Sequence, residues 1–432
     1  MIFIYFFTIL LIGLINNKNS TNFEYLYASR KLTLTSFIAT IVTTWYGAIL
    51  DVGRYTYENG IITWIIFCLF YYFSALLYGF LIGPRIHKKN ISSLPEFFIK
   101  RIGLNSGYIS SILIYLIGSP IPYIIIFSTI ISHVYNISYF NSVIIGVIAS
   151  NLYLYVGGFK SVIRTDKIQF ILMYLGFGIL IYNLYTQYGG YEFIISNIPQ
   201  KNLSLNIKEN MGILITWFFI SFTIFIDPSI FQRSYSSKNS LNIKKGFIFS
   251  VIFWIIFDFM TITAGLYASA IIPENKLITS PFLQLGSLVL PEYLNIIFII
   301  SLLAIVMSTI DSSTFISAIT LNNLIKMIKK KEEANFVVSL ASTSLFSIIM
   351  CYFFRHAINY WYIFGAITAS ALLIPFIFLL YNDNKKIKRP LTTLMIPIFL
   401  CSYFTIYGGI EPIYPGILSS IFLCIINNDK IS

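Results

Sequence analysis

Uncharged apolar runs recur along the whole chain. Residues 61–83, 103–132 and 335–354 contain no Asp, Glu, Lys or Arg, and a run of about 20 such residues crosses a bilayer as a helix. The same criterion predicts about thirteen transmembrane helices, which begin near residues 2, 36, 61, 110, 143, 165, 213, 246, 294, 335, 361, 391 and 414. The pattern therefore predicts an all-α, multi-pass membrane protein.

Composition supports this class of protein. Of the 432 residues, 57% are hydrophobic and 11% are charged, whereas soluble domains carry about 25% charged residues. Residues 1–14 lack a basic start and an Ala-x-Ala cleavage site, so they predict a short first helix and not a signal peptide. No connection is long enough for a soluble domain, so the function is expected to lie among the helices.

The Lys and Arg residues are concentrated in alternate connections between the predicted helices. With the N-terminus outside, nearly all of the 29 Lys and Arg residues fall in inner connections. The exceptions are Arg54, Lys201, Lys208, Lys276 and Arg355. Because inner loops are enriched in Lys and Arg, the N-terminus is predicted outside and the C-terminus in the cytoplasm, in a plasma or inner membrane. The net charge of +12 then reflects topology and not nucleic-acid binding, and Arg233 is interpreted as an interfacial anchor.

Four aspartates fall within or at the ends of the apolar runs: Asp51, Asp227, Asp258 and Asp311. An ionisable side chain at a helix centre costs roughly 2.5 to 3.5 kcal/mol on insertion scales, so each is a candidate for function. Asp258 could hold an ion or make a helix–helix hydrogen bond. Asp311 lies among six Ser and Thr residues; these could serve close helix packing, but their broad arc favours presenting oxygens to a cation.

Two apolar runs are interrupted at matching places. Gly47 and neighbouring threonines interrupt "TTWYGAIL" (43–50), and Asp227-Pro228 ends "TWFFISFTIFIDPS" (216–229). Proline removes a backbone donor and frees a carbonyl. Paired interrupted helices are typical of inverted-repeat transporters with a site at the midplane, and residues 43–47 are predicted to be the unwound hinge.

Five stretches resemble a known family in order and content. They are "ASRKL" (28–32), "SLPEFFIKRIG" (93–103), "GGFKSVIRTDKIQF" (157–170), "DPSIFQRSYSSKN" (227–239) and "MSTIDSSTFIS" (307–317). Together they resemble the sodium:solute symporters, the proline, pantothenate and sugar symporter group. The resemblance implies one transporter domain over residues 1–432 with a leucine-transporter-like five-plus-five inverted repeat and two broken helices. Its segments would be an extra first helix (2–18), two repeats (36–185 and 211–380) and two extra C-terminal helices (390–428).

The resemblance also implies a sodium site between the second and ninth helices. Its five oxygens would be carbonyls of Val42, Trp45 and Ile305 and hydroxyls of Ser308 and Thr309. Neutral oxygens suit a hard cation that must also leave. Asp166 matches a family aspartate on the sodium exit path; it could instead pair with Arg164 or Lys167.

The predicted function is sodium-coupled uptake of a small organic solute by alternating access, with Na⁺ as the co-transported ion and no organic cofactor. Substrate contacts are expected from Tyr46, Ser119, Tyr123, Trp217, Ser221 and Thr223. The alternatives are proton coupling through Asp51, Asp227, Asp258 or Asp311, or a sensor or degenerate paralogue that does not transport. An enzyme is not expected, because His87, His133 and His356 are isolated and lack paired metal or acid–base spacing. The sequence names neither the solute nor the oligomeric state.

Overall fold

The computed structural model describes residues 1–15, 21–205, 207, 210–278, 280–329 and 335–430. Within them the chain is almost wholly helical, and the one sheet is a two-stranded antiparallel pair near the C-terminus. Lys18, Lys208, Lys330 and Lys331, which the charge pattern assigns to loops, lie outside the described residues.

The elements are given in chain order. The first half contains α1 (Ile2–Leu14), α2 (Asn22–Tyr27), α3 (Leu34–Trp45), α4 (Ile49–Asn59), α5 (Ile62–Trp64), α6 (Phe70–Leu77), α7 (Gly83–Lys88), α8 (Leu94–Ile102), α9 (Leu104–Ile117), α10 (Ile121–Tyr135), α11 (Tyr139–Asn151), α12 (Leu154–Tyr188) and α13 (Tyr191–Asn197). The second half contains α14 (Met211–Ser221), α15 (Pro228–Ser236), α16 (Ser240–Ile271), α17 (Pro281–Val289), α18 (Glu292–Lys329), α19 (Phe336–Phe353), α20 (Ala357–Thr368), α21 (Ile374–Tyr381), β1 (Lys385–Ile387), α22 (Pro390–Tyr407), α23 (Ile413–Ile426) and β2 (Asn428–Lys430). Short 3₁₀ or π-helical segments join several of them: η1 (Ala28–Arg30), η2 (Ile65–Leu69), η3 (Tyr78–Ile82), η4 (Gln200–Asn202), η5 (Phe222–Ile226), η6 (Glu274–Lys276) and η7 (Ala369–Leu373).

A helix stands at every predicted position, but not every helix is long enough to span. Eight helical segments of the described chain meet the length and hydropathy needed to cross a membrane, or up to ten if each of two bent pairs counts as one span. The remaining three, α1, α11 and α23, have 13, 13 and 14 residues. At 1.5 Å per residue they are about 20 Å long, shorter than a hydrocarbon core of about 30 Å. A multi-pass membrane protein is confirmed, whereas the count of thirteen crossings stays a prediction.

The first bent pair lies where Gly47 predicts a break. α3 and α4 meet at 56°, and neither Gly47 nor Ala48 donates a backbone hydrogen bond to a described residue. Residues 43–45 nevertheless remain helical, so the predicted hinge is displaced to residues 46–48. The Thr43 and Thr44 hydroxyls donate to carbonyls one turn earlier, at 2.9 and 2.5 Å, and so the threonines stay within the helix.

The second bent pair lies at Asp227-Pro228, as predicted. The segment 211–226 meets α15 at 43°. Pro228 has no N–H, so the preceding helix cannot continue through it. Asp227 Oδ1 accepts hydrogen bonds from the N–H groups of Ser229 and Ile230, both at 2.8 Å, which is the side-chain cap that starts a new helix.

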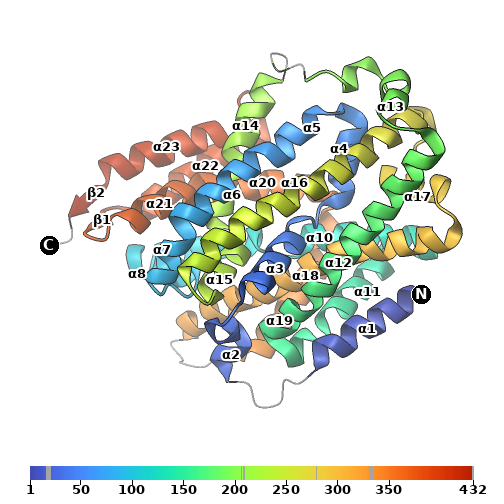
Figure 1. The fold of residues 1–432 in the computed structure, drawn as a ribbon. Coiled ribbons are helices and arrows are strands. Elements are labelled where there is room, and N and C mark those ends of the chain that lie inside the picture. The colour runs from blue at the N-terminus through green and yellow to red at the C-terminus, as the bar shows by residue number, and fades with distance from the viewer. Residues whose placement is uncertain (16–20, 206, 208–209, 279, 330–334, 431–432) are drawn as a thin grey trace.

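Three long helices run through the molecule (Figure 1): α12, α16 and α18, of 35, 32 and 38 residues. Every residue of α18 from Phe298 to Thr320 is buried, as expected of a helix surrounded by others. α18 packs against α12, α10, α9 and the broken helix α3. It is therefore the central helix against which the first break rests.

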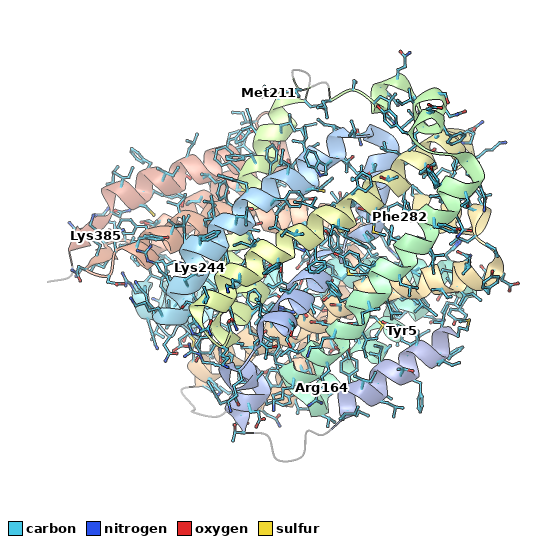
Figure 2. The ribbon with its side chains drawn as sticks, in the orientation of Figure 1. Tyr5, Arg164, Met211, Lys244, Phe282 and Lys385 are labelled. Atoms are coloured by element: carbon cyan, nitrogen blue, oxygen red, sulfur yellow. The ribbon has the colours of Figure 1, made fainter. Side chains whose placement is uncertain are left out.

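The predicted inner and outer connections separate in space. In Figure 2, Lys385 is labelled at the left end of the molecule, Arg164 at the bottom and Lys244 in the left half, and all three are assigned to the inner side. Met211, which ends a connection assigned to the outer side, is labelled at the top. This separation agrees with the alternation of loops, whereas the side that faces outward stays a prediction.

Candidate functional site

A cavity of about 220 Å³ lies where the two breaks meet the central helix. Its wall takes residues from both sides of the first break, from η5 and α15 at the second break, and from α6, α10, α16, α18 and α20. The wall is mostly aromatic and aliphatic with a few polar side chains, which is usual for a small-molecule site.

Four of the six predicted substrate residues line this cavity: Tyr46, Tyr123, Trp217 and Thr223. Ser119 and Ser221 do not. The Ser119 hydroxyl lies 2.8 Å from the hydroxyl of Tyr360, and Ser221 donates to the Phe218 carbonyl at 2.7 Å. Both hydroxyls are hydrogen-bonded to other protein groups, and neither serine lines the cavity. That Ser119 and Ser221 contact the solute therefore stays a prediction without support from the cavity.

Part of the predicted sodium site lies where α18 touches the end of α3. Thr309 on α18 donates to the Thr44 carbonyl at 3.3 Å and to the Ile305 carbonyl at 3.2 Å. The N–H of Ile49, which would continue the helix to Trp45, donates instead to the Tyr46 carbonyl at 3.0 Å. The Trp45 carbonyl therefore loses its helical donor, at a break that packs directly on α18.

Asp166 lies against this group of oxygens. Ser308 donates to Asp166 Oδ1 at 2.7 Å, and Thr40 donates to Oδ2. Asp166 is wholly buried. Its cationic partner is Arg233 at 3.7 Å, not Arg164, which donates to the Ile15 carbonyl. The alternative role of Asp166 as a partner of Arg164 or Lys167 is therefore not supported.

The interpretation of Arg233 as an interfacial anchor is wrong. Its side chain is 1% exposed and lines the cavity. A guanidinium has five N–H donors, and the structure gives it five hydrogen bonds, to Thr40 Oγ1 (2.8 Å), Thr44 Oγ1 (2.8 Å), Ser312 Oγ (2.7 Å), Ser229 O (3.2 Å) and Ser229 Oγ (2.5 Å). It thus joins α15 to α3 and α18 from within the fold.

The predicted coupling acids occupy two places. Asp227 and Asp258 line the cavity, together with Asp51. Tyr72 donates to Asp258 Oδ2 at 2.5 Å, so the helix–helix bond considered for Asp258 exists. Asp311 lies elsewhere on α18, wholly buried, and neither of its oxygens has a hydrogen-bond partner among the described residues.

Sequence reasoning missed the arginine and the hydroxyls around it. Thr40 and Thr44 are four residues apart on α3, as are Ser308 and Ser312 on α18, and residues at this spacing share a helix face. The two pairs of hydroxyls were therefore visible as two polar faces. Three of these four hydroxyls, those of Thr40, Thr44 and Ser312, surround the guanidinium of Arg233, and Ser308 donates to Asp166 instead. Arg233 lies on α15, 193 residues from Thr40 along the chain, so no local pattern contains it.

Comparison with known proteins agrees with this geometry. The sequence profile of the sodium:solute symporter family matches residues 25–396. The chain belongs to the sodium:solute symporter family. Among curated relatives, the sodium/pantothenate symporter of Haemophilus influenzae is 23% identical over 228 residues, which cover 50% of this chain and 47% of the relative. The sodium/pantothenate symporter of Escherichia coli is 22% identical over 314 residues, or 68% of this chain and 65% of the relative. The chain thus spans about half to two thirds of these relatives' lengths.

A solved structure shows the same fold. The substrate-bound, outward-open state of a Na⁺-coupled sialic acid symporter superposes with a TM-score of 0.80 at 16% identity, covering 99% of this chain and 95% of that one. Together with the two broken helices, this match confirms the predicted leucine-transporter-like fold. The boundaries of the two repeats stay a prediction.

Proposed function

We propose that this protein couples the inward movement of Na⁺ to the uptake of a small organic solute by alternating access. Family membership and the fold support a transporter, and the cavity between the broken helices is where such folds bind their cargo. The proposed sodium ligands are the carbonyls of Val42, Trp45 and Ile305 and the hydroxyls of Ser308 and Thr309.

One contact carries the proposal: the hydrogen bond from the Thr309 hydroxyl to the Thr44 carbonyl. It places an α18 hydroxyl against the carbonyls freed at the broken end of α3. A cation held there by oxygens of both helices would stabilise the arrangement in which they touch. Since ligands shift an equilibrium only by binding one state better than the other, sodium would favour the state that keeps this contact.

Asp166 adds a feature that the neutral oxygens alone do not provide. Its carboxylate is fixed by Ser308 and Thr40 and neutralised by Arg233. Because Ser308 donates its proton to Asp166, its oxygen lone pairs are free to face a cation. We propose that Asp166 orients the Ser308 oxygen toward sodium and receives the ion when the two helices separate.

The proposed direction of transport follows from the charge pattern. With the N-terminus outside, sodium enters from the outer side and gains about 2.3 kcal/mol per 100 mV of inside-negative potential. This energy would support accumulation of the solute against its gradient.

Binding of ²²Na⁺ to the purified protein tests the proposal without knowledge of the solute. Thr309→Ala and Ser308→Ala are expected to weaken sodium binding by about tenfold or more. Thr320→Ala is the matched control, because Thr320 lies on the same helix, is buried and donates to the carbonyl four residues earlier, as Thr309 does, but lies outside the proposed cage. Equal binding by all four proteins would exclude the site.

Proton coupling has one observation in its favour, the buried Asp311 carboxylate without a hydrogen-bond partner in the described chain. A proton could neutralise it. The measurement that separates the two functions is uptake or binding at constant pH with Na⁺ replaced by K⁺. Sodium coupling requires a loss of signal in K⁺, whereas proton coupling through Asp311 requires that the signal persist in K⁺ and disappear in Asp311→Asn.

A further inference from the structure

We propose that the solute is an organic cation, a compact molecule that carries an ammonium or quaternary ammonium group and binds in the cavity between the two helix breaks. The inference rests on the proposed uptake function and names the class of substrate.

Three carboxylates from three different elements face the cavity: Asp51 on α4, Asp227 at the start of α15 and Asp258 on α16. Asp51 Oδ2 is buried without a hydrogen-bond partner in the described chain. Asp227 caps α15 through Oδ1, and Asp258, which is 4% exposed, accepts from Tyr72 through Oδ2. A buried acceptor such as Asp51 Oδ2 requires a donor or a positive charge.

Among the described residues, no basic group of the cavity wall is free to balance them. Arg233 is the one Lys or Arg that the described lining contains, and all five of its N–H donors are used by protein oxygens. Its charge is matched by Asp166 at 3.7 Å. Arg54, which follows Asp51 by three residues, points its charge at Glu58 instead, at 2.9 Å. The described part of the wall therefore carries three carboxyl groups and no unmatched cationic side chain.

The rest of the wall suits a cation as well. Trp45, Tyr46, Tyr71, Tyr123, Trp217 and Trp361 all line the cavity. Aromatic rings attract ammonium and quaternary ammonium groups through their π electrons. Several of these rings are held by other rings: Trp45 lies 4.9 Å from Tyr71, and Tyr123 lies 5.4 Å from Trp361, between ring centroids. A rigid aromatic wall keeps its shape around a small cation.

An anionic solute fits this wall poorly. A carboxylate ligand would need donors, but the guanidinium offers none, and the carboxylates of Asp51, Asp227 and Asp258 would repel it. A cationic solute binding together with Na⁺ would place two positive charges in one region, and the three carboxylates are what would offset them. The chain is therefore expected to differ in cargo from the pantothenate symporters that it resembles.

The test measures the thermal stability of the purified full-length protein, in NaCl or in KCl, with one probe at a time. Potassium replaces sodium because organic replacement cations are themselves candidate ligands. The decisive pair of probes is choline and its neutral isostere, in which carbon replaces the quaternary nitrogen; tyramine, pantothenate, proline and glucose complete the set. Choline or tyramine is expected to raise the unfolding temperature in NaCl in a concentration-dependent way, and the neutral isostere is not.

Charge-neutralising variants locate the effect. Asp258→Asn and Asp51→Asn are each expected to weaken binding of the cationic probe by about tenfold or more, with the sodium response retained. Glu192→Gln is the control, because Glu192 lies exposed on α13, away from the cavity. If Asp258→Asn does not fold, Asp51→Asn still tests whether the cavity carboxylates bind the cationic probe.

The outcomes separate this inference from the proposed function. If sodium alone stabilises the protein and only pantothenate, proline or glucose adds to it, the coupling stands and the cationic substrate is excluded. The inference is also overturned if neither ammonium probe stabilises the protein, or if choline and its neutral isostere act alike. If a cationic probe binds and sodium has no effect in any combination, the cavity is assigned correctly and sodium coupling is not.

Discussion

Replacing Arg233 with lysine keeps the positive charge but removes the fork of donors that joins three helices around the cavity. Arg233 is 1% exposed, and its five N–H groups donate to oxygens of α3, α15 and α18. An ammonium group has three donors at a single point. Arg233→Lys therefore loses at least two of the five hydrogen bonds but keeps the positive charge at this position.

The expected cost follows from those two bonds. A hydrogen bond to a charged group contributes about 1.5 to 3 kcal/mol, so the variant should lose roughly 3 kcal/mol or more of unfolding free energy. Arg389→Lys is the matched control, because Arg389 is an exposed residue of the connection before α22. Its unfolding free energy should change by no more than about 0.5 kcal/mol.

Reversible unfolding of the purified protein in detergent measures both values, and a reporter fused to the C-terminus checks that orientation is unchanged. The reasoning is refuted if Arg233→Lys and Arg389→Lys are equally stable, since Arg233 would then act only as a positive charge. Arg233→Met adds an independent test. Arg233→Met leaves the buried Asp166 carboxylate without its cationic partner and should lower the unfolding free energy by about 3 to 5 kcal/mol. The double variant Arg233→Met with Asp166→Leu should recover part of that loss.

Three more substitutions test other parts of the structure. A Cβ on Gly47 would lie 2.3 Å from the Tyr123 ring, so Gly47→Ala should destabilise the protein by about 1 to 3 kcal/mol and weaken sodium binding. Asp311→Asn removes a charge that the described chain leaves without a partner, so its unfolding temperature should equal or exceed that of the parent. Asp383 is paired with Lys89 at 2.5 Å, and this bond lowers its pKa below the usual value. The exposed pair should contribute under about 1 kcal/mol, present above the usual pKa and lost as pH falls through the lowered one, so Asp383→Asn should match the parent only in acid.

Each of these has a control or a contradicting result. Gly212→Ala, with nothing within 4 Å of the added carbon, should leave stability and sodium binding unchanged; if it behaves like Gly47→Ala, the close contact is not the cause. A marked loss of stability in Asp311→Asn would show that this carboxylate has a partner. A constant difference between Asp383→Asn and the parent at every pH would show that the ion pair does not titrate as described.

The two helix breaks were predicted from the backbone chemistry of single residues. Pro228 lacks an N–H and Gly47 lacks a side chain, and the structure bends at both places. The exact position of the first break was harder to predict, because threonine was taken as a helix breaker. In the structure the hydroxyls of Thr43 and Thr44 donate hydrogen bonds to carbonyls of the preceding turn. Whether a threonine does so depends on which groups surround it.

The site was predicted in part. The α18 hydroxyl of Thr309 does meet the broken end of α3 at Thr44, whereas Ser308 donates to Asp166. Four of six predicted substrate residues line one cavity. Arg233 was misplaced because a count of basic residues along a chain treats every Lys and Arg near a helix end as a loop residue. In the structure Arg233 is buried inside the fold and is not a loop residue. Burial depends on how the helices pack, which a count along the chain does not contain.

By itself the sequence determined the class of protein, the places where helices form and the two points where they break. These features follow from the hydropathy of about 20 consecutive residues and from the backbone chemistry of single residues. Only the tertiary structure decided that Arg233 is enclosed by hydroxyls of three helices, and that Asp51, Asp227 and Asp258 face one space to which the described residues supply no unmatched cation. The reason is that a charge is balanced by whichever groups packing brings within a few ångströms, and those groups lie far away along the chain.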